Sequence, residues 1–268
     1  MNQMLETKES ALINLLKKYR HPAIAFSGGV DSSVVLAACR VAGIKAEPIM
    51  ADTRVVPLFE KQDAIQVATE TNYMLTCLAH DPLEDDKFRA NDEQRCYYCK
   101  KRLMTAILKK AQSLGCDIVL DGANADDIGD YRPGMQATHE LGIVSPLLTC
   151  GLTKIEVRKL AEKYNLSVAQ KPAYACLASR IAYGEEITED KLRMVEKAED
   201  GLRALGLNNV RVRCHGKLAR IEVSPQEIEA VATTQREKII ELIQEAGFLF
   251  VTLDLQGYRT GSMNIVFK

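Results

Sequence analysis

The chain has 268 residues, 47% of them hydrophobic, so it can bury a sizeable core in one large or two modest domains. Its 35 basic and 36 acidic residues leave a formal net charge of −1, which disfavours a protein that binds nucleic acid mainly through its phosphates. The first residues lack a basic and apolar leader, and no apolar stretch reaches the roughly 20 residues of a membrane span, so we expect a cytoplasmic protein. Eight cysteines in that compartment do not predict a disulfide framework.

Apolar runs and helical patterns alternate through the first part of the chain. After an amphipathic helix over 5–19, we expect strands at 23–26, 46–51, 74–78 and 117–120 and helices at 32–42, 59–70, 97–113 and 153–164. This alternation predicts an α/β fold, a doubly wound parallel sheet with helices on both faces. The ligand of such a sheet binds beyond the carboxyl ends of its strands.

The pattern changes after residues 169–186, which have little periodicity and which we interpret as a functional loop and hinge. Beyond them we expect a helix over 188–205, a hairpin of 210–214 and 218–223, mostly helix over 225–246, and strands at 248–253 and 264–267. We therefore divide the chain into a first domain, 1–183, and a smaller α+β domain, 184–268.

The most informative motif is Ser27-Gly28-Gly29-Val30-Asp31-Ser32, which lies between a predicted strand and a predicted helix. Glycines let backbone amides turn toward an anion, and a helix start adds free N–H groups and the positive end of its dipole. The motif therefore predicts a pyrophosphate site. A carboxylate at Asp31 would repel phosphate unless a metal lay between them, so we expect Mg²⁺ there.

This motif lacks the lysine of a Walker A site and the third glycine of a dinucleotide fingerprint. It resembles instead the pyrophosphate loop, or PP-loop, of the N-type ATP pyrophosphatases. The resemblance implies an adenine nucleotide alpha hydrolase-like fold and cleavage of ATP between its α- and β-phosphates, with AMP passing to an oxygen of the substrate. It also implies that Asp52 and Thr53, at the second strand end, meet adenine and ribose, and that Arg54 reaches a phosphate.

A second polar cluster, Asp121-Gly122-Ala123-Asn124-Ala125-Asp126-Asp127, follows the strand predicted at 117–120. Its carboxylates are expected at the same edge of the sheet as the glycine loop. Gly122 is then a candidate nucleotide contact and Asp126 a candidate magnesium ligand. Alternatively, Asn124 or Asp126 caps the next helix.

Cys96, Cys99 and Cys176 do not fit an apolar interior. The first two share a face at the start of a predicted helix, where the dipole and nearby basic residues favour thiolates. One Cys-x-x-Cys pair is too few for a zinc site, and the preceding strand context does not match a thioredoxin-like pair. Cys176 lies in the irregular segment between Lys171 and Arg180, two cations expected to favour its thiolate. Half-buried, incidental cysteines are the alternative.

The glycine loop, the segment Cys176-Leu177-Ala178-Ser179-Arg180 and the strand Arg211-Val212-Arg213 together resemble the LarE family over nearly the whole chain. The resemblance implies an ATP-dependent sulfur transferase for building the nickel-pincer nucleotide, the cofactor of lactate racemase. Its substrate is pyridinium-3,5-biscarboxylic acid mononucleotide, which is adenylylated on a carboxylate and converted to a thiocarboxylate. The resemblance implies catalytic roles for Asp31, Cys176 and Arg180.

Members of this family differ in their sulfur source. One type has a single cysteine at the position of Cys176 and gives up its own sulfur. Another adds a Cys-x-x-Cys pair, and the three thiolates resemble the ligands of a [4Fe-4S] cluster with one iron left open to hold hydrosulfide. Cys96, Cys99 and Cys176 match the second type, and single-cysteine donation is the alternative. The sulfide donor is not identified by the sequence.

Arg211 and Arg213 alternate on a predicted strand and so point to one face, where two guanidiniums can hold a phosphate. An ordinary charged hairpin is the alternative. The resemblance implies that both bind the substrate phosphate, that Glu199 contacts the substrate, and that the second domain serves substrate binding and oligomerisation. We therefore expect a homo-oligomer.

Other functions remain open. A tRNA-thiolating enzyme of the same superfamily also uses three cysteines and a cluster, but usually carries zinc-binding pairs or a basic RNA surface. An amide-forming synthetase such as NAD synthetase has no use for the three cysteines. A regulatory nucleotide-binding module would not need Asp31, Ser32 or Cys176.

Overall fold

The computed structural model describes residues 3–127, 133–172, 174–207, 209–259 and 261–263. They form two compact units: unit 1 comprises Met1–Pro82 and Cys96–Tyr174, and unit 2 comprises Leu83–Arg95 and Ala175–Lys268. The chain therefore passes between the units three times, after Pro82, Arg95 and Tyr174. This differs from the division at residue 183, because residues 83–95 and 175–183 pack with the second unit.

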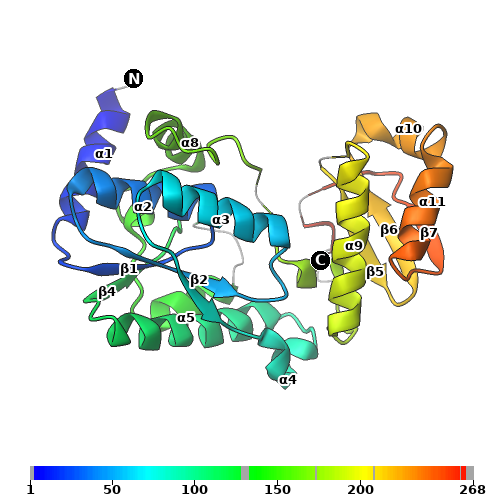
Figure 1. The fold of residues 1–268 in the computed structure, drawn as a ribbon, viewed down its shortest axis with the longest axis horizontal. Coiled ribbons are helices and arrows are strands. Elements are labelled where there is room, and N and C mark those ends of the chain that lie inside the picture. Colours follow the sequence, from blue (N-terminus) through cyan, green and yellow to red (C-terminus); the bar gives the residue numbers. More distant parts are fainter. Residues whose placement is uncertain (1–2, 128–132, 173, 208, 260, 264–268) are drawn as a thin grey trace. The chain divides into compact units, whose positions relative to one another are not determined.

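Unit 1 is built on a parallel sheet with the strand order β3-β2-β1-β4 (Figure 1). Its strands are β1 (Pro22–Ala25), β2 (Glu47–Asp52), β3 (Thr76–Ala79) and β4 (Ile118–Leu120). In the register, Ala23 of β1 lies between Glu47 of β2 and Val119 of β4. Because β2 and β4 flank β1 on opposite sides, the winding direction changes between β1 and β4. Ligands of open α/β sheets bind at such a switch point.

Successive strand residues face opposite sides of this sheet, and each side has its own core. Ile24 and Leu120 pack on one side in a cluster with α1 (Gln3–Leu16), α2 (Val30–Ala42), α3 (Leu58–Glu70) and α8 (Lys154–Lys163). Their neighbours Ala23 and Val119 pack on the other side with α5 (Arg95–Ser113). Helices thus cover both faces, which confirms the doubly wound sheet (Figure 1). Unit 1 also contains the short helices α6 (Pro133–Glu140) and α7 (Pro146–Thr149).

Unit 2 is a smaller α+β unit with a mixed sheet in the order β5-β6-β7. Its strands are β5 (Arg211–His215), β6 (Leu218–Glu222) and β7 (Phe250–Leu253), and its helices are α4 (Asp86–Arg89), α9 (Glu189–Ala204), α10 (Ile228–Ala232) and α11 (Arg236–Glu245). Strands β5 and β6 form the predicted antiparallel hairpin, and β7 runs parallel to β6. Thr188 caps α9 as predicted, accepting a hydrogen bond from the Lys191 amide.

Asn91 connects the two separate pieces of unit 2. It is fully buried, and its side-chain amide donates to the carbonyls of Ala182 (2.8 Å) and Glu185 (2.9 Å). Its own carbonyl accepts from the Gly184 amide, 3.2 Å away. Residues 83–95 are therefore an integral part of unit 2. Asn91 has a φ of 56°, which asparagine tolerates better than most residues with a side chain do.

The predicted elements occur with ends shifted by up to a few residues, except that the helical stretch at 225–246 divides into the 3-10 turn Pro225–Glu227, α10 and α11. The strand predicted at 264–267 lies outside the described residues. No helix of the described chain is long and apolar enough to cross a membrane.

Candidate functional site

The glycine loop leaves β1 and enters α2, and its own serines shape it. The Ser32 hydroxyl accepts from the Ser27 amide (3.3 Å), donates to the Gly29 carbonyl (3.2 Å) and lies 3.2 Å from the Ser27 hydroxyl. Gly29 is the extended N-cap residue of α2, with no side chain to occupy the helix start. The free amides of this turn are therefore available to an anion.

Two glycines are required by close approaches around this loop. Gly28 has φ 71°, and a Cβ there would lie 2.5 Å from the Ala64 Cβ of α3. A Cβ on Gly122, after β4, would lie 2.7 Å from the Ser32 amide nitrogen. The two strand ends on either side of the switch point are thus in direct contact, as the sequence predicted.

Asp31 lies in the first turn of α2 and connects both loops with α8. Its Oδ1 accepts from Asn124 Nδ2 (3.2 Å), and its Oδ2 pairs with Lys154 Nζ (2.5 Å). The Lys154 amide donates to Asp126 Oδ2 (2.9 Å). A capping box of Thr153 and Glu156 begins α8 and places Lys154 here.

Magnesium binding is compatible with this donor set. Among the described residues no group of three or more metal-binding side chains occurs. Mg²⁺ usually needs only one or two carboxylates besides phosphate oxygens and water. Asp31 lines the cavity over the strand ends and Asp126 does not, so ligation of one ion by both stays a prediction. The capping alternative is also seen, since Asn124 Oδ1 accepts from the Asp126 amide (3.0 Å) at the 3-10 turn Ala125–Asp127.

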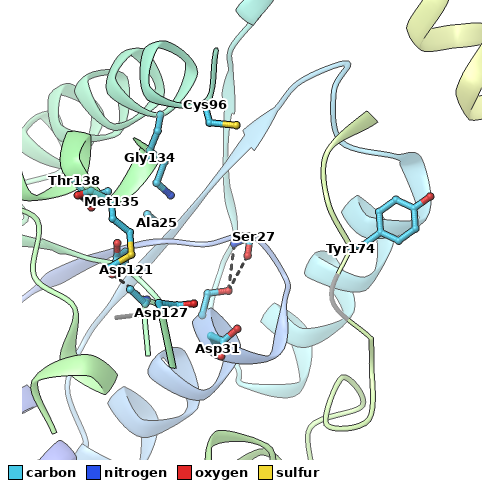
Figure 2. A pocket seen from close by; sticks show the side chains of 14 residues that line it. Ala25, Ser27, Asp31, Cys96, Asp121, Asp127, Gly134, Met135, Thr138 and Tyr174 are labelled. Atoms are coloured by element: carbon cyan, nitrogen blue, oxygen red, sulfur yellow. Dashed lines mark hydrogen bonds between the residues drawn. The ribbon is translucent and has the colours of Figure 1, made fainter. Parts of the chain in front are cut away.

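A cavity of about 610 Å³ opens over these strand ends (Figure 2). Its lining comes from the end of β1, the glycine loop, the Asp121 loop, α5, α6 and the residue before the last chain crossing. The lining residues include Ser27, Asp31, Asp121, Cys96, Lys100 and Tyr174. In Figure 2 Tyr174 is well separated from Asp121.

Lys100 is the site residue that sequence reasoning missed. It lines the cavity from α5. Burial lowers the pKa of Lys100, while Asp121 and Cys99 act in the opposite direction. The Cys-x-x-Cys-Lys spacing could have indicated that Lys100 lies beside Cys96, since residues 96 and 100 are about one turn apart on a helix and share a face.

Asp52, Thr53 and Arg54 do not line this cavity. Asp52 pairs with Lys61 (2.6 Å), and Arg54 lies 3.8 Å from Asp81. Thr53 is buried, with its hydroxyl unpartnered among the described residues.

Cys96 and Cys99 lie in unit 1 at the start of α5, with Cys96 exposed and Cys99 half-buried. Cys176 lies in unit 2 and is also half-buried, at the start of the 3-10 turn Leu177–Arg180. A site shared by the three thiols therefore stays a prediction.

Arg180 and Glu199 form a fully buried ion pair in unit 2, with Nε 2.9 Å from Oε1. Glu199 Oε1 also accepts from the Val212 amide (3.0 Å). Arg180 Nη1 donates to the carbonyls of Ala175 (2.5 Å) and Cys176 (3.1 Å), so this guanidinium holds the backbone around the cysteine. Lys171 also has carboxylate partners, so both cations expected to favour the Cys176 thiolate are themselves paired, and their effect on it stays a prediction.

Arg211 and Arg213 are both nearly buried on β5. Arg213 Nη2 donates to Glu222 Oε2 (2.7 Å) and to the Ser262 hydroxyl (3.1 Å). Arg211 Nη1 donates to the Val210 carbonyl (2.8 Å), and its guanidinium lies 5.0 Å from the Tyr258 ring centre. Arg213 Nε is buried without an acceptor among the described residues, and so remains available to an anion.

No protein-family model matches the chain. The chain is 36% identical over 262 residues to pyridinium-3,5-bisthiocarboxylic acid mononucleotide synthase of Lactiplantibacillus plantarum, covering 97% of this chain and 95% of that protein. The chain belongs to this synthase family, the LarE family. It is also 41% identical to an uncharacterized protein of Synechocystis, over 98% of this chain and 99% of that one.

Among solved structures, NMN synthetase from Francisella tularensis matches with a TM-score of 0.51 and 17% identity, over 63% of this chain and 75% of that chain. This likeness concerns the fold, and it confirms the PP-loop architecture predicted from the glycine loop. Membership of the LarE family confirms the resemblance seen in the sequence and makes the chain an enzyme of the ATP-dependent PP-loop class.

Proposed function

We propose that the chain is an ATP-dependent sulfur transferase that converts a carboxylate of pyridinium-3,5-biscarboxylic acid mononucleotide to a thiocarboxylate. The observation that carries the proposal is the full-length identity to the synthase of Lactiplantibacillus plantarum, named for the bisthiocarboxylic acid mononucleotide. The cavity over the glycine loop supports it, because a nucleotide phosphate chain needs this combination of amides and cations.

Activation of the substrate is the first step. A carboxylate is a poor electrophile, because its negative charge repels a sulfur anion. Its oxygen attacks the α-phosphorus of ATP, the bond to the bridging oxygen breaks, and pyrophosphate leaves. The amides of the glycine loop and the start of α2 stabilise the charge that develops on the departing group.

Two cationic elements complete this step. Asp31 and Asp126 would hold Mg²⁺, which supplies charge neutralisation at the leaving pyrophosphate. Lys100 extends into the same cavity and, in its protonated form, takes the part of the lysine that the loop motif lacks. Gly122, Asp52, Thr53 and Arg54 are proposed contacts of the adenine, ribose and phosphate groups.

The substrate is held by unit 2 in this proposal. Arg211 and Arg213 bind its phosphate, and the unpartnered Nε of Arg213 supports this role. Arg180 and Glu199 pair with each other, and Arg180 donates to the carbonyls of Ala175 and Cys176, so they are proposed to position the Cys176 segment. The homo-oligomer expected from the family resemblance stays a prediction.

The source of sulfur is the finer part of the proposal. Cys96, Cys99 and Cys176 can each supply a thiolate, and soft thiolates suit iron. Cys96 and Cys176 each lie within two residues of a point where the chain crosses from one unit to the other. A [4Fe-4S] cluster held by the three would supply sulfide to the activated carboxylate.

Pyrophosphate release in the presence of the mononucleotide tests the first step. Asp31→Ala should abolish release while leaving the fold intact, and Asp190→Ala, an exposed carboxylate on α9, should not change it. Release that does not depend on the mononucleotide would contradict the proposed substrate. Retained tRNA would favour the tRNA-thiolating alternative.

Anaerobic iron and sulfide analysis tests the sulfur source. Cys96→Ala should lose iron, whereas Cys77→Ala, an exposed cysteine of β3, should keep it. Iron-free protein that loses about 34 Da, the mass of H₂S, at Cys176 after one turnover would show sacrificial donation instead.

A further inference from the structure

The segment that leads out of unit 1 toward Cys176 is fixed to α8. Arg158, on that helix, donates from Nη1 to the Ala169 carbonyl (2.6 Å) and from Nη2 to the Lys171 carbonyl (2.8 Å). The Lys171 amide donates to the Val168 carbonyl (3.0 Å), which closes a turn. The backbone around Lys171 therefore has a defined path although its sequence has little periodicity.

The Lys171 side chain then connects this segment with α3. Its Nζ lies 2.9 Å from Glu60 Oε2 and 2.6 Å from Asp63 Oδ2, and the side chain is only 14% exposed. It also lies over the ring of Phe59, against which Tyr174 packs edge-on with ring centres 5.0 Å apart. We call these five residues the α3 tether. Losing the cation would leave two carboxylates close together in a partly buried place.

The same helix supports the nucleotide loop. Ala64 lies one turn after Glu60 on α3, and its Cα and Cβ leave no room for a side chain on Gly28. Tyr174, at the end of the tether, lines the cavity together with Ser27 (Figure 2). Helix α3 is thus a rigid connection between the glycine loop and the chain that continues to Cys176.

We propose that Lys171 is a positioning residue for sulfur transfer, acting through Glu60 and Asp63. Cys176 follows Tyr174 by two residues, so the α-carbons of these two residues are at most about 7 Å apart. Fixing Tyr174 on α3 therefore limits where the Cys176 thiol can lie relative to the activated carboxylate. The inference rests on the proposed function and adds to it a residue that controls the second step.

The chemical consequence is a competition at the acyl-adenylate. When sulfur attacks the acyl carbon, AMP leaves and a thiocarboxylate remains. When water attacks the same carbon, AMP leaves, the carboxylate is regenerated and the ATP is spent without product. A loosened tether favours water, since sulfur is no longer held in reach. The ratio of pyrophosphate released to thiocarboxylate formed measures this competition.

The test compares Lys171→Met with wild type and with Lys8→Met as matched control. Lys8 is another partly exposed lysine of unit 1, with a carboxylate partner, Glu156, at 2.7 Å. In Lys171→Met, pyrophosphate release should stay within about threefold of wild type while the ratio rises about tenfold or more, as misplacement of a reacting group predicts. Iodoacetamide should also label Cys176 faster without ATP. Lys171→Arg, which can bridge both carboxylates, should restore the wild-type ratio.

An unchanged ratio and unchanged labelling in folded Lys171→Met would overturn the proposal, as would an equal loss of both steps. If this variant does not fold, Glu60→Gln with Asp63→Asn releases the same lysine with little change in volume, and the same outcomes apply. Absence of mononucleotide-dependent pyrophosphate release in wild type refutes the proposed function. The labelling rate of Cys176 then still decides whether Lys171 restrains the segment.

Discussion

The contact between Gly28 and α3 allows a quantitative test of how the glycine loop is held. Gly28→Ala would place a methyl group 2.5 Å from the Ala64 Cβ and 2.7 Å from its Cα, distances that real Cβ atoms do not show. A left-handed backbone costs a non-glycine residue about 1–2 kcal/mol, and an overpacked contact about 1–3 kcal/mol more. We expect a total loss of about 2–5 kcal/mol in the free energy of unfolding of unit 1.

Gly43 provides the matched control. It has the same φ of 71°, but a Cβ there would meet nothing within 4 Å. Gly43→Ala should therefore show only the backbone cost of about 1–2 kcal/mol. The difference between the two variants isolates the contact with Ala64.

Urea unfolding of both variants measures the stabilities, and a fluorescent ATP analogue measures nucleotide binding. Gly28→Ala should be the less stable of the two and should bind the nucleotide weakly, because the loop or α3 must move. Gly43→Ala should bind it as wild type does. Equal stabilities together with normal binding by Gly28→Ala would refute the role given to this contact.

Three further predictions concern single groups. Burial lowers the pKa of Lys100, and phosphates bound beside its ammonium would raise that pKa again. At alkaline pH, ATP binding should therefore take up protons and weaken as the pH rises. Calorimetry in two buffers should show this uptake in wild type and its loss in Lys100→Met. Burial raises the pKa of Cys39 to about 12, so iodoacetamide at pH 8 should label exposed Cys77 and spare Cys39, and equal labelling would show that the core opens. Arg180→Leu removes the buried ion-pair partner of the Glu199 carboxylate and should lower the free energy of unfolding, measured with urea, by about 3–5 kcal/mol. A loss below about 1 kcal/mol would contradict the structural importance of that pair.

The glycine loop could be predicted because all its signals are contiguous. A strand, two glycines and a helix start follow one another between Ala23 and Ala42, so local conformational preferences are enough. The Asp121 cluster followed from the rule that parallel strands end at one edge. Lys100 was not predicted, because its place in the cavity depends on how α5 packs against the sheet.

Tertiary contacts also explain why two features of unit 2 could not be predicted from the sequence. Arg180 was expected beside Cys176, but its ion-pair partner Glu199 lies 19 residues further on, and no local pattern pairs these two residues. Residues 83–95 are richer in charged residues than the rest of the chain, but nothing in their sequence assigns them to unit 2. Their place follows from Asn91, whose side-chain amide donates to carbonyls of residues that are made much later.

This arrangement limits when unit 2 can finish folding during synthesis at the ribosome. The Asn91 amide must wait for the carbonyl of Ile181, which is 90 residues further along the chain. At about 5–20 residues per second, that is roughly 5–20 seconds during which the nascent segment has no permanent neighbours. Completion of unit 2 is therefore tied to translation beyond the cysteine-bearing turn, and a fragment beginning at Ala175 would leave those carbonyls without their donor.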